Sequence, residues 1–150
     1  KSEIATFLEA FPYGTIWANT VNGQGYDLVL LGRLDSTPID VGVLEERLLQ
    51  PEYREVRASL AEVGIDSGMD LLSTYAGRAA ELGPWLEDAE INRDRNLRLQ
   101  YLAGLGINRY EQNLIYRQML SYITYPEELF VGPDGSLAWL RGVITGVPDP

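Results

Sequence analysis

FPYGTIWANTVNGQGYDLVLLG, residues 11–32, decides how this chain folds. The segment 15–19 carries β-branched and aromatic residues and the segment 26–31 is mostly apolar, so each predicts a β-strand. Asn22-Gly23 lies between them and is typical of a turn. Because a two-stranded hairpin is only marginally stable in water, we expect further strands or a covering helix beside it.

The second of these strands, Leu28 to Leu31, is apolar at every position, which predicts a central strand buried on both faces. Residues 1–10 predict a helix that ends at Phe11-Pro12, because proline disfavours helical geometry in the residue before it. No strand is predicted ahead of this helix. We therefore expect the sheet to begin before residue 1 and the chain to be the C-terminal part of a larger fold.

The composition limits the possible functions. The 150 residues are 45% hydrophobic and 23% charged, which is typical of one globular domain. A net charge of −10 disfavours nucleic acid and favours cationic small molecules, although solubility alone would also explain it. The absence of cysteine and histidine excludes disulfides, thiol nucleophiles, zinc sites built on these residues and imidazole triads. The chain shows no signal peptide and no apolar run that could span a membrane, and its composition fits a cytoplasmic protein.

Beyond Gly32 the pattern changes to helices. Asp40 predicts the cap of a helix that reaches about Gln50, and Ser67 the cap of a short helix through Tyr75. A helix that begins at Pro51 would carry an apolar stripe of Tyr53, Val56, Leu60 and Val63. Further helices are expected over residues 78–86 with a break at Gly83-Pro84, over residues 108–123, from Pro126, and over residues 137–144 after a cap at Ser136. Residues 97–101 alternate like a short strand.

Two stretches of the chain resemble the spermidine synthase-like family, which comprises aminopropyltransferases and their relatives with the class I methyltransferase fold. FPYGTIWANT with YDLVLLG is similar to the end of that family's Rossmann-type sheet, where a hairpin returns the last strand antiparallel. INRDRNLRLQY, residues 91–101, is similar to a segment that often reads asparagine-threonine-aspartate-aspartate-arginine-proline, then an aliphatic residue, an acid and an aromatic. The positions that fit are Asn92, Asp94, Leu99 and Tyr101, and those that depart are Arg93, Arg95, Asn96, Leu97 and Gln100.

The resemblance implies an α/β fold, which as a fragment has α+β character. Residues 1–35 would be the C-terminal hairpin of a Rossmann-type methyltransferase sheet, and residues 36–150 a mostly helical extension. In the family, decarboxylated S-adenosylmethionine or S-adenosylmethionine and the catalytic aspartate belong to the N-terminal half of the fold. This chain would then hold no cofactor and no catalytic residue. It would complete the sheet of that missing half, cover the amine side of a polyamine aminopropyltransferase-type site, and be inactive alone.

Five residues are candidate substrate ligands: Trp85, Glu90, Asn92, Asp94 and Tyr101. An aromatic ring beside carboxylates holds an amine through cation–π contact and charge-assisted hydrogen bonds, and Glu87 and Asp88 add to the carboxylates near Trp85. A solvated helix end with Trp85 in the core explains the same pattern, since nearby arginines can neutralise the acids.

Two other functions remain open from the residues. The first is a free-standing acidic helical module for protein interaction, without enzymatic activity. The second is a small nucleotide-binding enzyme that uses Gly104-Leu105-Gly106, although Arg109 stands where the fingerprint has its third glycine. The five tyrosines between residues 101 and 125 leave two roles open, which are packing in the core for most of them and an aromatic surface for contact with a second copy of the chain.

Overall fold

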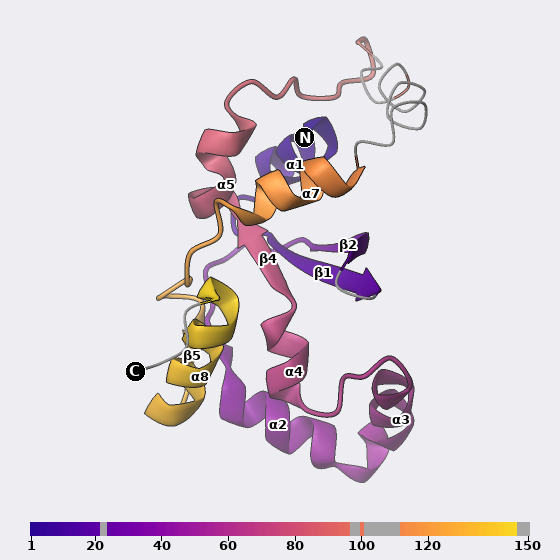
Figure 1. The fold of residues 1–150 in the computed structure, drawn as a ribbon, viewed down its shortest axis with the longest axis vertical. Coiled ribbons are helices and arrows are strands. Elements are labelled where there is room, and N and C mark those ends of the chain that lie inside the picture. The colour runs from indigo at the N-terminus through magenta and orange to yellow at the C-terminus, as the bar shows by residue number, and fades with distance from the viewer. Residues whose placement is uncertain (22–23, 97–99, 101–111, 147–150) are drawn as a thin grey trace. The chain divides into compact units, whose positions relative to one another are not determined.

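The computed structural model describes residues 1–21, 24–96, 100 and 112–146, and within them the chain has mixed α and β structure (Figure 1). The described residues divide into two compact units. The chain leaves the first unit after Asp35, returns to it at Tyr75, and leaves it again after Ile123. The second unit comprises the described residues 36–74 and 124–146.

The first unit is built on a three-stranded antiparallel sheet with the order β2-β1-β4 (Figure 1). The hairpin is confirmed: β1 (Thr15–Val21) pairs with β2 (Gln24–Leu31). The expectation that Leu28 to Leu31 form a central strand is wrong for the described chain. β1 takes the central place instead, because β4 (Tyr75–Arg78) pairs with its other side and leaves β2 at the edge.

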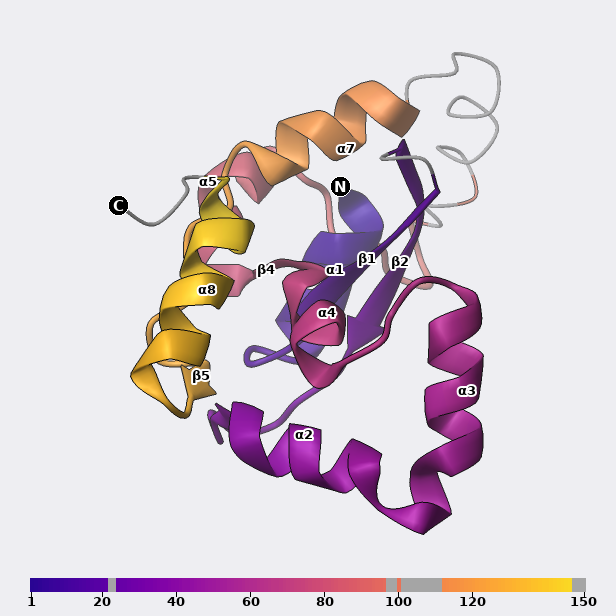
Figure 2. The same ribbon diagram turned by 60° about the horizontal axis from the view of Figure 1, so that its bottom comes forward.

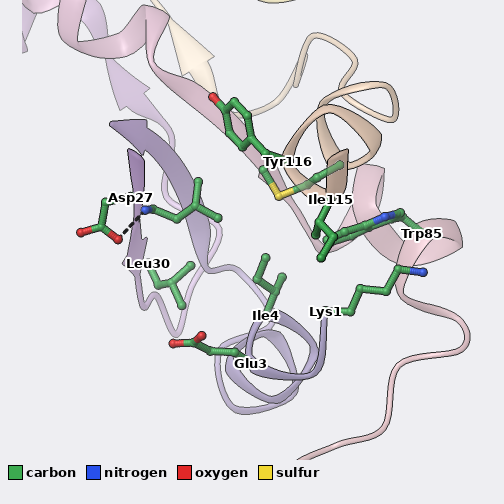
Figure 3. A pocket seen from close by; sticks show the side chains of 10 residues that line it. Lys1, Glu3, Ile4, Asp27, Leu30, Trp85, Ile115 and Tyr116 are labelled. Atoms are coloured by element: carbon green, nitrogen blue, oxygen red, sulfur yellow. Dashed lines mark hydrogen bonds between the residues drawn. The ribbon is translucent and has the colours of Figure 1, made fainter. Parts of the chain in front are cut away.

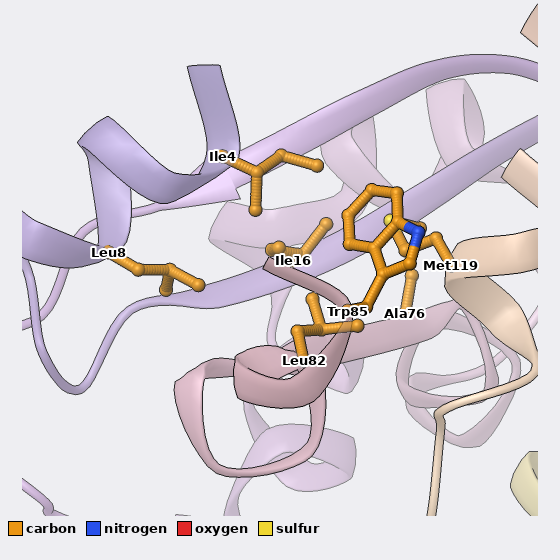
Figure 4. Packing of buried hydrophobic residues seen from close by; sticks show 7 residues of the cluster. All are labelled: Ile4, Leu8, Ile16, Ala76, Leu82, Trp85 and Met119. Atoms are coloured by element: carbon orange, nitrogen blue, oxygen red, sulfur yellow. The ribbon is translucent and has the colours of Figure 1, made fainter. Parts of the chain in front are cut away.

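Helices α1 (Ser2–Ala10), α5 (Ala79–Leu86) and α7 (Gln112–Leu120) supply most of the core of this unit. Figure 4 shows the cluster, which consists of Ile4, Leu8, Ile16, Ala76, Leu82, Trp85 and Met119. Side chains of β1 and β2 alternate between faces, so Ala18, Leu28 and Leu30 pack against this cluster. Val29 belongs to the opposite face and is 56% exposed.

The second unit is mainly helical (Figure 2). Its strands β3 (Ile39–Asp40) and β5 (Phe130–Val131) form a short parallel pair. Helix α2 (Val41–Leu49) follows β3 directly, and helix α8 (Asp134–Thr145) begins shortly after β5. The 3-10 helix η1 (Pro51–Tyr53) leads into α3 (Arg54–Glu62), and α4 (Gly68–Ser73) packs against α2 and α8.

Two predicted helix caps are confirmed. The Asp40 carboxylate accepts a hydrogen bond from the Val43 N–H at 3.0 Å, and the Ser67 hydroxyl accepts one from the Asp70 N–H at 3.0 Å. Each cap satisfies a backbone donor that would otherwise lack a partner at the start of the helix.

Several predicted boundaries in the second half of the chain are wrong. Tyr75 belongs to strand β4, since α4 ends at Ser73. α5 continues through Gly83-Pro84 because its start is capped by Glu81 and because burial of Leu82 and Trp85 offsets the hydrogen bond that proline removes.

The two helices expected nearest the C-terminus also differ from prediction. Residues after Pro126 form a turn, in which the Leu129 N–H donates to the Pro126 carbonyl at 2.9 Å, and not a helix. α8 begins at Asp134, before the expected cap at Ser136, since an acidic side chain in the first turn favours a helix start. The predicted strand over residues 97–101 and the loop Gly104 to Gly106 lie outside the described residues, apart from Gln100.

Candidate functional site

The first unit contains a cavity of about 350 Å³ (Figure 3). α1 supplies Ile4, β2 supplies Leu28 and Leu30, and α7 supplies Ile115 and Met119, so most of the wall is apolar. A cavity of this volume is large enough for a small ligand. The wall offers a ligand hydrocarbon contact over most of its surface.

Two carboxylates stand at the edge of this cavity. Glu3 lies in the first turn of α1 and Asp27 lies on β2, and both side chains are exposed. Asp27 Oδ1 accepts a hydrogen bond from the Leu28 N–H at 2.8 Å, which fixes the carboxylate beside the strand. A cationic group at this edge would meet two negative charges.

Trp85 forms part of the cavity wall and also belongs to the core. The side chain is 3% exposed, and no residue in the described part of the chain accepts a hydrogen bond from its Nε1. The indole therefore packs in the core, as one of the two alternatives expects, and one part of it also lines the cavity. Its fixed ring provides a rigid wall.

Lys1 places a positive charge against Trp85. Its Nζ lies 2.9 Å from Asp88 Oδ1 and 5.4 Å from the centroid of the Trp85 ring. The hydrogen bond from Lys1 holds the pKa of Asp88 below its ordinary value. The Lys1 ammonium group thus makes the contacts with an aromatic ring and a carboxylate that the sequence led us to expect for an amine ligand at Trp85.

Among the described residues, the predicted site residues Glu90, Asn92 and Asp94 do not line this cavity. The Asn92 N–H donates to Thr6 Oγ1 at 2.8 Å, which fastens the segment after α5 to α1. Glu90 and Asp94 are exposed on this segment, and Tyr101 lies outside the described residues. Among the four that the structure describes, only Trp85 lines the cavity.

Sequence reasoning missed Lys1, Glu3 and Asp27. Each is a charged residue near the end of a helix or on a strand, a position at which surface residues are common. No spacing rule connects residues 1, 27 and 88, because the fold alone brings these segments together. Only the acidic stretch around Trp85 carried a sequence signal.

A second polar cluster of the first unit joins β4 to α5. The Tyr75 hydroxyl donates to Glu81 Oε2 at 2.8 Å, and the Arg78 side chain donates to Glu81 Oε1 at 3.0 Å. The Glu81 side chain is 5% exposed. Burial, followed by the neighbouring Glu81 charge, raises the pKa of Tyr75 above its ordinary value, so Tyr75 is neutral and acts here as a hydrogen-bond donor.

The part of the chain that the structure describes contains neither a metal-binding cluster nor a helix that could span a membrane. Across the described ranges, no group of three or more acidic side chains is placed to hold a metal ion. Within the same part of the chain, no helix combines the length and the apolar character needed to cross a bilayer. No protein-family model, curated protein or solved structure matches the chain.

Proposed function

We propose that this chain is the C-terminal segment of a spermidine synthase-like protein. It completes a Rossmann-type sheet that the N-terminal half of the same fold begins, and it covers the amine side of a polyamine aminopropyltransferase-type site. It performs no catalysis alone, since the cofactor and the catalytic base belong to the other half.

The observation that carries this proposal is the outer edge of β2. No strand pairs with that edge among the described residues, and Val29 and Leu31 on this strand are 56% and 49% exposed. Native proteins usually cover, charge or bend such an edge. An apolar strand with an open edge is what a sheet interrupted at this point would present.

The cavity supports the amine side of the proposal. Its apolar wall suits the methylene groups of an aliphatic amine, and Glu3 and Asp27 supply negative charge at its edge. The net charge of −10 further favours a cationic ligand.

The open edge can be tested by measuring self-association of the purified chain. We expect concentration-dependent association in analytical ultracentrifugation, because unpaired strand edges join to one another. Val29→Lys places a charge on the edge and should give a monomer. Val63→Lys, the same change at a 71% exposed position in the second unit, should leave the association unchanged.

The absence of a cofactor site is tested by calorimetry. Neither S-adenosylmethionine nor its decarboxylated form should bind to the purified chain. A micromolar dissociation constant for either compound would contradict the proposal, since it would place the cofactor site inside this segment.

A free-standing acidic interaction module is the alternative, and one observation favours it. β1 has a strand partner on both sides within the chain, so the hairpin is partly enclosed without any missing half. A module of this kind should be monomeric at all concentrations and should unfold cooperatively. The association measurement therefore separates the two functions.

A further inference from the structure

The C-terminal end of α5 forms a corner with the properties of an ammonium site. Trp85 provides the face of an aromatic ring, and Glu87 and Asp88 follow it in sequence after Leu86. These three residues and Lys1 border a hollow beside the cavity described above. Aromatic rings and carboxylates together are the groups that proteins use to bind ammonium ions.

The structure places an ammonium group in this corner. Lys1 Nζ contacts Asp88 Oδ1 at 2.9 Å and lies 5.4 Å from the centre of the Trp85 ring. The contact thus identifies the chemistry that the corner accepts. Figure 3 shows the Lys1 ammonium beside the Trp85 ring.

Lys1 is held weakly enough to be replaced. The Lys1 side chain is 35% exposed and the Asp88 side chain 77% exposed. Ion pairs this open to solvent contribute little to stability, because water and salt screen them. Trp85, in contrast, is fixed by the core cluster. The corner therefore has a rigid wall and an exchangeable occupant.

The adjoining cavity indicates what kind of group the ammonium ion should carry. Lys1 and Trp85 border both the hollow and the cavity, so an ammonium group at the position of Lys1 Nζ stands next to the apolar wall. Among the described residues that line the two, Lys1 is the only basic one, whereas four are acidic. The surroundings thus favour a cation with a hydrocarbon chain and disfavour an anion.

We propose that the Trp85–Asp88 corner is a binding site for an alkylammonium ion, and that Lys1 is a tethered competitor which occupies it when no ligand is bound. This site lies wholly within the described part of the first unit. It goes beyond the proposed function, because it requires neither the N-terminal half nor an open sheet edge.

The test is an isothermal titration calorimetry experiment in which n-hexylammonium chloride is added to the full chain. We expect saturable binding in the millimolar range, because the ligand must displace Lys1. Hexan-1-ol, which has the same hydrocarbon chain without the charge, should bind at least about tenfold more weakly, since it forms no charge-assisted hydrogen bond. Equal binding of the two compounds would overturn the assignment of an ammonium site.

Two variants and a matched control examine the role of Lys1. Lys1→Met keeps an unbranched side chain one atom shorter and without the charge, and it should tighten hexylammonium binding about three- to tenfold because the competing occupant is removed. Asp88→Asn should weaken binding about fivefold or more, since the carboxylate acceptor is lost. Glu46→Gln removes the same charge from an exposed position of α2 and should change nothing.

The results can overturn the proposal in two ways. If Lys1→Met leaves hexylammonium binding unchanged or weakens it, Lys1 is not a competitor. If Asp88→Asn and Glu46→Gln have equal effects, the net charge of the chain explains the binding and the corner does not. Asp88 is highly exposed, so its substitution leaves the core of the first unit intact. The self-association of the chain is unaffected by either result, so the proposed function stands or fails separately.

Discussion

Helices α5 and α3 show how differently two helices of this chain are used. α5 contains Gly83-Pro84, which normally disfavours a helix interior, yet it buries Leu82 completely and Trp85 to 3% exposure. α3 has the regular apolar stripe of an amphipathic helix, yet in this fully described helix no residue is buried. Val56 is 48% exposed, and Val63, just after the helix, is 71% exposed. Periodicity therefore predicts that a helix forms, whereas burial depends on what the fold places against it.

The largest expected effect tests this difference in burial directly. Leu82→Ala should lower the free energy of unfolding by about 2–5 kcal/mol, because it leaves a cavity in the cluster around Ile16 and Trp85. Leu60→Ala makes the same change in α3 and should cost about 1 kcal/mol or less. Urea denaturation followed by circular dichroism gives both values, and equal losses would show that α3 is as well packed as α5.

The next prediction concerns the strand that supports α5. Gly77 has a φ of +122°, and a Cβ at this position would lie 2.8 Å from Ile123 Cδ1 and 3.0 Å from Leu82. Gly77→Ala should therefore cost about 2–4 kcal/mol through backbone strain and overpacking. Gly135→Ala in α8, where a Cβ meets no atom of another segment within 4 Å, should instead add about 0.5–1 kcal/mol of stability. Thermal unfolding should move in opposite directions for the two variants.

The hydrogen bond between β4 and α5 gives a pH-dependent prediction. Tyr75→Phe should cost about 1–3 kcal/mol at neutral pH, because the buried Glu81 carboxylate loses a donor. Since the pKa of Tyr75 is raised in the folded chain, its contribution is fully present below the ordinary tyrosine pKa of about 10 and is lost as the pH rises above it.

Denaturation between neutral and alkaline pH measures this contribution. The wild-type chain should lose stability above about pH 10, and the Tyr75→Phe variant should lose less over the same range. Tyr122→Phe, at a 41% exposed position, serves as the control and should follow the wild type. Parallel curves for the wild type and Tyr75→Phe would show that another group causes the alkaline loss.

The smallest expected change in the free energy of unfolding concerns two serines of the second unit. Ser67→Ala removes the cap of α4 and should cost about 1 kcal/mol. Ser59→Ala in the middle of α3 removes no cap and should stay within about 0.5 kcal/mol of the wild type, because Ser59 is exposed. A matching loss at Ser59 would mean that α3 depends on contacts that its exposure does not suggest.

Local chemistry explains which predictions were correct. The hairpin and the caps at Asp40 and Ser67 depend on residues close together in sequence. Strand β2 lies at the sheet edge because β4 pairs with β1, and this pairing brings Tyr75 beside Trp17. These segments are far apart in sequence, so no local sequence pattern could predict their pairing. The same reason explains the site. The acidic stretch near Trp85 was visible, but Lys1 contacts Trp85 and Asp88 from 84 and 87 positions away in sequence.

The sequence by itself determined where this chain turns and where several of its helices begin, because turn residues, prolines and capping side chains act on neighbouring backbone. It also determined the acidic character and the absence of histidine and cysteine chemistry. Only the tertiary structure decided which strand lies at the centre of the sheet, which helix is buried, and which cation lies against Trp85. These outcomes depend on the free energy of contacts between distant segments, and such contacts exist only once the chain has folded.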